Sequence, residues 1–338
     1  MLNQTVNILT KSGLTWFVPM VRLAAGEDPR EQLREILYKI GVPIVAFVCF
    51  ILLWGGLAKS VQTSLGELPG PVAVWQAAGG LVDEHQRERA KAQAFYERQE
   101  ERNAAKLAAN PDAQVRIRPW TGKPTYWDQI KTSLVTVFTG FLLATLVAVP
   151  LGVVCGLSGA VQTALNPMIQ LFKPVSPLAW LPIVTLVVSA VYVSADPMFE
   201  KSFLISAITV TLCSLWPTLM NTAVGVASVD KDLINVSRVL KLSWFAKVRK
   251  IVLPSSLKLI FTGLRLSLGV GWMVLIAAEM LAQNPGLGKF VWDEFQNGSS
   301  ESLARIMVAV FTIGVIGFLL DRIMATLQQL ASFGEPVS

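Results

Sequence analysis

The 338-residue chain contains a single histidine and three cysteines, and only 15% of its residues are charged. His85 lies among charged residues far from any cysteine, which argues against a histidine-based metal site or a Ser-His-Asp triad. Cys49, Cys155 and Cys213 are scattered through apolar segments, so free packing thiols are predicted. The sequence has no Gly-x-x-x-x-Gly-Lys-Ser/Thr phosphate loop with which to hydrolyse ATP itself. We therefore predict no catalytic residue, no metal ligand and no bound cofactor.

Apolar residues, by contrast, are abundant. The hydrophobic fraction is 53% and the mean hydropathy is +0.52, outside the range of soluble globular domains. The net charge of +6 does not indicate nucleic-acid binding, because the cations flank apolar runs and form no solvated basic domain. No signal peptide is predicted, since a mixed-charge run precedes the first long apolar stretch. The composition predicts an all-α integral membrane protein.

Six apolar segments are predicted to cross a bilayer as helices. They lie at residues 41–58, 130–157, 178–193, 203–229, 259–282 and 303–327. The third is short and begins after Pro174, Pro177 and Pro182. We divide the chain into an interfacial N-terminal segment (1–40), the first span (41–58), a helical insert (59–128), a core with the remaining spans (129–327) and a tail (328–338).

Charge in the short loops predicts the orientation. The connection 230–258 carries seven cations against two acids: Lys231, Arg238, Lys241, Lys247, Arg249, Lys250 and Lys258 against Asp230 and Asp232. Placing this connection in the cytoplasm puts both termini there too, and leaves loops with Asp196 and Glu200 and with Asp293, Glu294 and Glu301 outside. The insert is then extracytoplasmic. Its stretch 83–106 predicts a solvated helix with i,i+4 charge pairs, either a spacer or a docking element for a partner.

The segment 235–254 within this connection is basic and amphipathic. In a helix, its apolar residues would form one stripe: Val236, Val239, Leu240, Trp244 and Val248. Such a stripe suits a groove on another protein, but a basic amphipathic helix also rests on a bilayer surface. The pattern alone leaves both interpretations open.

The same segment resembles the EAA loop of ABC-importer permeases, which reads Glu-Ala-Ala, three residues, Gly, nine residues and Ile-x-Leu-Pro. Ile251-Val-Leu-Pro254 matches fully and in register, whereas Asn235 replaces the Glu and Lys241 replaces the Gly. A Lys adopts a left-handed turn less readily than Gly, so the break between the two short helices is expected to differ in shape. The resemblance assigns to ATPase coupling Asn235, Arg238, Lys241, Leu242, Ser243, Trp244, Phe245, Ile251, Leu253 and Pro254.

Further segments resemble the nitrate/cyanate/bicarbonate permease group, to which taurine and alkanesulfonate permeases are related. They are residues 176–182, 214–226, 261–266, 277–280, 286–288 and 291–294. The resemblance implies six transmembrane helices of the ABC-importer permease type, a cytoplasmic coupling helix and a place in the bacterial inner membrane. It further implies a homodimer, two ABC ATPase subunits and an extracytoplasmic solute-binding protein.

The implied substrate is a small anion moved by alternating access: nitrate foremost, with nitrite, cyanate or bicarbonate as options. One alternative is a taurine or alkanesulfonate permease. Another is a secondary transporter or channel without an ATPase. That class predicts inverted repeats and several intramembrane ionisable residues. We find no clear repeat, and Glu279 is nearly alone.

Seven residues are candidates for the pathway or its gate: Glu279, Arg265, Trp180, Thr136, Trp216, Gly286 and Gly288. A carboxylate at membrane depth is costly, so Glu279 either forms a gate, or lies at the headgroup level or caps the next loop's amides. Arg265 either attracts an anion at the inner exit or extends to the interface. Thr136 and its neighbours Thr132, Ser133 and Thr139 either face a solute or bond their own helix.

Overall fold

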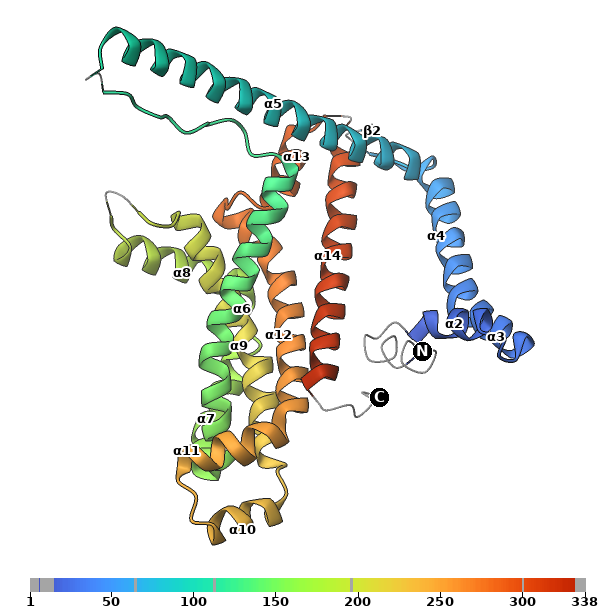
Figure 1. Cartoon of the computed structure of the whole chain (residues 1–338), viewed down its shortest axis with the longest axis vertical. Helices are drawn as coiled ribbons and strands as arrows, with labels where there is room; N and C mark the ends of the chain where they lie inside the picture. The colour runs from blue at the N-terminus through green and yellow to red at the C-terminus, as the bar shows by residue number, and fades with distance from the viewer. Residues whose placement is uncertain are drawn as a thin grey trace.

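The computed structural model describes residues 6, 15–63, 66–111, 114–194, 197–299 and 301–331. Within these ranges the chain is almost entirely helical (Figure 1), and the only strands are the short antiparallel pair β1 (Gln62–Thr63) and β2 (Gly66–Glu67). The predicted all-α membrane architecture is confirmed. Asp196, which we expected in a loop, lies outside the described residues.

Five continuous helical stretches of the described chain are long and apolar enough to span a bilayer. The first joins α3 (Pro29–Ile36), the π-helical turn η2 (Leu37–Gly41) and α4 (Val42–Ala58). The others contain α6 (Tyr126–Leu157), α9 (Lys201–Ala227), α12 (Leu253–Ala282) and α14 (Ser302–Ala331). All five coincide with predicted spans.

The remaining predicted span is not a straight helix. Residues 178–193 correspond to α8 (Pro177–Val191), which α7 (Gly159–Phe172) precedes at a bend of 99°. Pro174 and Pro177 lie at this bend, where proline interrupts helical hydrogen bonding. No helix was predicted at residues 159–172, where α7 lies. Counted as one broken span, the pair brings the total to six.

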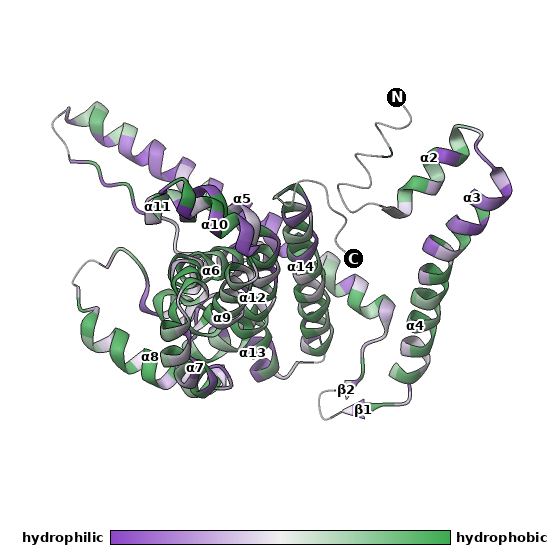
Figure 2. Ribbon diagram, turned by 90° about the horizontal axis from the view of Figure 1, so that it is seen from below, coloured by the Kyte–Doolittle hydropathy of each residue, from purple (hydrophilic) through white to green (hydrophobic). Residues whose placement is uncertain are grey.

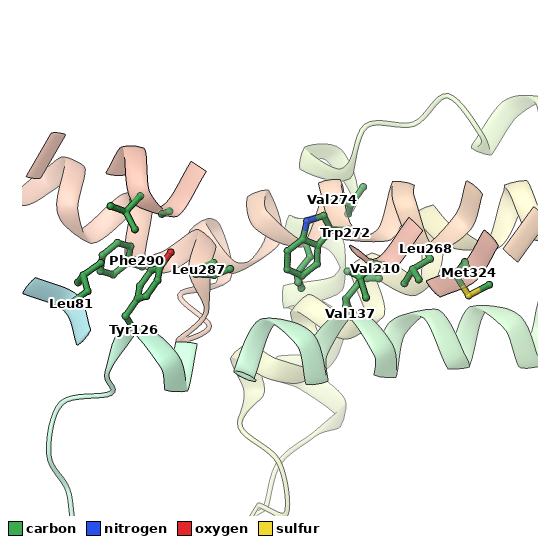
Figure 3. Packing of buried hydrophobic residues seen from close by; sticks show 14 of the residues in the cluster. Leu81, Tyr126, Val137, Val210, Leu268, Trp272, Val274, Leu287, Phe290 and Met324 are labelled. Atoms are coloured by element: carbon green, nitrogen blue, oxygen red, sulfur yellow. The ribbon is translucent and has the colours of Figure 1, made fainter. Parts of the chain in front are cut away.

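Helices α6, α9 and α12 form the core of the bundle, with α14 against α12 (Figure 1). Small residues allow this close packing, as is usual between membrane helices. A Cβ on Gly152 of α6 would lie 2.8 Å from the carbonyl oxygen of Leu219 on α9. Buried side chains, including Val137, Val210 and Leu275, fill the space between the three helices (Figure 3).

The predicted charged helix exists and is longer than expected. Helix α5 (Pro71–Ala109) crosses one end of the bundle and extends beyond it (Figure 1), and residues 114–125 return alongside. The amide N–H of Trp120 donates to Tyr96 Oη at 2.9 Å, and that of Arg118 donates to Gln99 Oε1 at 2.9 Å. These bonds hold the returning segment to the helix. We call this end of the bundle the α5 end, and the opposite end, which carries α10 (Lys231–Val239), the α10 end.

The first span stands apart from the bundle. None of the apolar window within residues 29–58 is buried, and Figure 2 shows α4 as hydrophobic along its whole length. Its ring contact with the bundle is Trp54 against Phe311 of α14, with centroids 5.2 Å apart. The short helices η1 (Thr15–Phe17) and α2 (Val18–Ala24) precede it, where the sequence analysis expected an interfacial segment.

Candidate functional site

The loop at the α10 end folds into two short helices separated by a turn. They are α10 (Lys231–Val239) and α11 (Trp244–Lys247), and the π-helical turn η3 (Val248–Val252) then leads into α12. Lys241 stands at the turn with φ +47°, in the left-handed region. Its N–H donates to Arg238 O, and that of Leu242 donates to Ser237 O, both at 3.0 Å. This is the Schellman helix ending that glycine usually provides. The expectation that lysine would change the shape of the break is therefore wrong.

A single apolar stripe does not form, because the turn at Lys241 separates its members. Val248 is buried with Val153 of α6 and Val226 of α9, and thus fastens the loop to the bundle. The other members remain exposed and, with Phe245, form what we call the coupling patch: Val236, Val239, Leu240, Trp244 and Phe245. The exposed fraction is 59% for Trp244, 68% for Phe245 and 82% for Val239.

Polar and basic residues surround the coupling patch. Asn235, Arg238, Lys241, Arg249 and Lys250 are exposed. The side chain of Ser243 begins α11 by accepting from the amide of Ala246 at 3.3 Å. The three remaining assigned apolar residues, Leu242, Ile251 and Leu253, are half-buried, and Pro254 is exposed at the start of α12. An exposed apolar patch with a basic rim is compatible with both interpretations, a groove on another protein and a bilayer surface.

A second cluster lies at the α5 end, around the buried carboxylate of Glu279 on α12. Ser133 Oγ of α6 lies 2.9 and 2.8 Å from its two oxygens, and the amide N–H of Gly288 donates to Oε2 at 3.0 Å. Ser133 Oγ in turn accepts from the amide of Leu287 at 2.9 Å. Glu279 thus caps the start of α13 (Leu287–Asn297), one of the roles expected of it. A gating role stays a prediction.

The turn before α13 depends on this arrangement. Helix α12 ends at Gln283, with φ +56°, and the chain then passes directly over the carboxylate. A Cβ on Gly286 would overlap the Glu279 oxygens, and one on Gly288 would overlap Ile276 O. The side chain of Asn284 donates to Thr136 Oγ1 at 3.2 Å. The structure therefore brings together four of the seven pathway candidates: Glu279, Thr136, Gly286 and Gly288.

The hydroxyl groups near this cluster are largely used within their own helix. Thr132, Thr136 and Thr139 donate to the carbonyl oxygens four residues earlier, at 3.0, 2.8 and 2.8 Å. Of the alternatives for this group, bonding to the helix is the one observed. Ser133 differs, since its hydroxyl reaches Glu279 on another helix.

Arg265 and the two tryptophans lie elsewhere. Arg265 donates to Asp321 of α14 through Nε at 2.5 Å and Nη2 at 2.8 Å. Neither expected role of Arg265 included this ion pair, and no role was predicted for Asp321. Trp180 and Trp216 both contact Phe172 at the bend between α7 and α8, with centroids 5.9 and 6.4 Å apart. The Nε1 atom of Trp180 is buried and makes no hydrogen bond in the described chain.

A further polar network was also missed. Arg305 of α14 donates to Glu294 of α13 at 2.7 Å and pairs with Glu84 of α5. The hydroxyl of Ser302 donates to Glu294 at 3.0 Å. Nearby, Tyr126 and Phe290 lie side by side with Leu81 (Figure 3), and the two ring centroids are 4.9 Å apart. These contacts join α5, α13 and α14 around the Glu279 cluster. Glu84 was predicted only as part of the solvated helix 83–106, and Glu294 only as a charge of an outer loop and a member of the motif 291–294.

No group of three or more His, Cys, Asp or Glu residues in the described ranges could hold a metal ion. Two features of the described chain stand out: an exposed apolar patch at the α10 end and a buried polar cluster around Glu279 at the α5 end.

Comparison with known proteins relates this arrangement to transport proteins. Residues 148–332 match the family described as "Binding-protein-dependent transport system inner membrane component". The nitrate import permease protein NrtB of Synechococcus elongatus is 39% identical over 210 residues, covering 62% of this chain and 70% of that protein. The bicarbonate transport system permease protein CmpB of the same organism is 31% identical over 297 residues, covering 88% and 91%.

A more distant relative is the taurine transport system permease protein TauC of Escherichia coli, 32% identical over 207 residues (61% of this chain, 70% of that protein). Among solved structures, an inward-facing form of the MetNI methionine ABC transporter aligns with a TM-score of 0.53 at 12% identity. The alignment covers 61% of this chain and 95% of that one, and it establishes a shared fold.

Proposed function

Because the chain belongs to the family of inner-membrane components of binding-protein-dependent transport systems, we propose that it forms the transmembrane pathway of an ATP-driven importer for a small anion. The substrate that similarity favours is nitrate, with bicarbonate next. Members of this family are transport components, and ATP hydrolysis is proposed to take place in partner subunits.

The coupling patch is the observation that carries this proposal. Its five apolar side chains are exposed at the end of a loop that Val248 and Val252 fasten to the bundle. Burying a large apolar side chain contributes roughly 1.5–3 kcal/mol, so covering the partly exposed patch would contribute on the order of 5 kcal/mol to docking. The exposed cations at the rim of the patch favour a partner whose docking surface is acidic. An ATPase subunit is the proposed occupant.

The α10 end is proposed to face the cytoplasm. Seven cations against two acids in residues 230–258 favour that side, in accordance with the positive-inside rule. The α5 end, with its long charged helix, then faces the solute-binding protein that delivers the anion. Two copies of the chain are proposed to enclose the pathway. ATP-dependent closure of the ATPases would shift the pair between inward- and outward-facing states.

Co-purification with the ATPase tests the docking surface. Trp244→Asp and Arg238→Glu should each abolish co-purification, since one places a charge in the patch and the other reverses the charge of its rim. The matched control is Trp127→Asp, because Trp127 is similarly exposed, at 50%, but lies at the α5 end. Undiminished ATPase binding by both patch variants would refute the interface.

Isotope uptake by the assembled system tests the substrate. We expect the system to take up nitrate faster than bicarbonate or taurine. A catalytically dead ATPase should abolish this uptake. Uptake that persists without a functional ATPase would refute the importer mechanism. Preference for bicarbonate or taurine would instead reassign the substrate.

A further inference from the structure

The break between α7 and α8 lies at membrane depth. The ring of Phe172, the last residue of α7, stacks on Trp216 of α9, with centroids 6.4 Å apart and planes inclined by 11°. Helical rise places Trp216 about 23 Å from Lys201 and about 17 Å from Ala227, the two ends of α9. Figure 1 shows α8 leaving the bundle between the α5 and α10 ends. The break is therefore well inside an apolar layer about 30 Å thick.

The backbone of the break is irregular. Residues 173–176 follow α7 and precede α8 without belonging to either helix. Such backbone is tolerated at membrane depth only where protein buries it or where it lines a water-filled cavity. Lys173, Pro174 and Ser176 are exposed in the single chain, so packing within the chain does not account for the break.

Lys173 is the cation of this break. Within the described part of the chain its side chain makes no ion pair and no hydrogen bond. The nearer end of α9 is about 17 Å away, which is too far for a lysine side chain to extend to the headgroups. The buried indole N–H of Trp180, whose ring centroid is 5.9 Å from that of Phe172, is a second donor without an acceptor among the described residues. A charge at this depth needs an opposite charge and faces a watery cavity.

A second copy of the chain offers no free carboxylate at this depth in its described spans. Helices α4, α7, α8 and α9 contain no Asp or Glu, and α6 has only Asp128, in its first turn at the α5 end. The two deeper carboxylates, Glu279 and Asp321, are already engaged by the partners described above. A phospholipid phosphate lies at the headgroup level, outside the apolar layer. The counter-charge of Lys173 is therefore a mobile anion.

We propose that Lys173 binds the transported anion midway along the pathway, one lysine coming from each of the two copies. This inference rests on the proposed function and adds to it a residue that holds the anion at membrane depth. The ammonium group donates a charge-assisted hydrogen bond to an oxygen of nitrate or bicarbonate. Lysine is a strongly hydrated point charge on a flexible stem, so it releases the anion more readily than a bidentate arginine site would.

The maximal rate of nitrate uptake by vesicles containing the complete importer tests this role. Lys173→Gln should lower that rate tenfold or more, about the equivalent of losing one charge-assisted hydrogen bond. Lys173→Arg keeps the charge and should retain most of the uptake. The matched control is Lys59→Gln, because Lys59 is also exposed but lies at the end of α4, apart from the bundle. This control should transport at the unmodified rate.

Thiol modification of Lys173→Cys distinguishes a pathway position from a lipid-facing one. The chain used has Cys49, Cys155 and Cys213 replaced by alanine and is first shown to import nitrate. Methanethiosulfonates react with the thiolate, which forms in water and not in lipid. The 2-aminoethyl reagent should react and, by restoring an ammonium group, recover uptake, whereas the neutral methyl reagent should react without recovery. Leu52→Cys, 69% exposed within α4, should not react.

Two results would overturn the proposal while leaving the proposed function intact. One is an unmodified importer and a Lys173→Gln variant that take up nitrate at the same rate. The other is a Lys173→Cys thiol that does not react while the same chain imports nitrate. If the unmodified importer takes up no anion at all, the proposed function fails and this inference fails with it.

Discussion

Replacing Glu279 with alanine should release α13 from the bundle. The change leaves two buried donors without an acceptor, the hydroxyl of Ser133 and the amide N–H of Gly288. An unsatisfied buried group costs about 1–3 kcal/mol, but side-chain hydrogen bonds in membrane proteins average nearer 0.6 and reach about 1.7. We therefore expect the loss of both bonds to lower the free energy needed to open α13 by about 2 kcal/mol. That corresponds to a roughly 30-fold larger open population of α13.

Hydrogen exchange by mass spectrometry measures this population directly. Peptides covering residues 284–297 should exchange about 30-fold faster in Glu279→Ala, by the same free-energy conversion. Peptides from α9, residues 201–227, serve as the internal reference and should not change. Glu279→Gln keeps one acceptor oxygen and should give an intermediate rate. Equal exchange rates in the alanine variant and the unmodified chain would refute the fastening role.

A double-mutant cycle isolates the contact itself. Ser133→Ala removes the partner of Glu279 and also the acceptor for the Leu287 amide. Because the two side chains share a hydrogen bond, the double variant should lose about 0.6–1.7 kcal/mol less than the sum of the single losses. Additive losses would show that the two residues act independently. Anion uptake in the same variants would then test whether a loosened α13 alters transport, as a gate requires.

Two further predictions concern individual helices. Lys241→Gly should stabilise the loop at the α10 end by about 0.5 kcal/mol, because the left-handed conformation costs a non-glycine residue about 1 kcal/mol and glycine's freedom in the unfolded chain offsets part of the gain. Thermal unfolding should place Lys241→Gly above Lys241→Ala, and the opposite order would contradict the argument. Arg265→Gln should lower the free energy of unfolding by about 1–2 kcal/mol. This loss is smaller than that expected for a fully buried ion pair, because both side chains are about a third exposed. Adding Asp321→Asn should recover part of the loss, since it removes the carboxylate left without its partner. Denaturant unfolding in mixed micelles measures both, and a double variant less stable than either single one would exclude this pairing.

The sequence predicted most of the fold because hydropathy over about 20 residues is a strong signal for a membrane helix. It failed at α7 (Gly159–Phe172), where Asn166 and Pro167 interrupt the apolar run and the bend of 99° depends on packing. The long helix α5 was foreseen only in its charged part. The helix begins at Pro71, in an apolar stretch for which no helix was predicted.

The sites were predicted in part. The cost of a buried carboxylate singled out Glu279, but its partner Ser133 is 146 residues away and no local pattern connects them. Asp321 lies inside the predicted span 303–327, but its partner Arg265 is 56 residues away on another helix, and no local pattern connects the two. The coupling loop was located from its motif, yet periodicity could not reveal that Val248 points inward while Trp244 points outward.

The continuity of α11, η3 and α12 has a mechanical consequence. Helical hydrogen bonding is uninterrupted from Trp244 to Ala282, although α11 lies across the lower end of α12 (Figure 1). This continuous stretch therefore has a short segment, α11, that carries Trp244 and Phe245 of the coupling patch, and a long arm, α12, that ends near Glu279. From Leu253 to Glu279 the long arm measures about 39 Å, at a rise of 1.5 Å per residue. A rotation of about 5° at η3 would displace the far end by roughly 3 Å, about the length of one hydrogen bond.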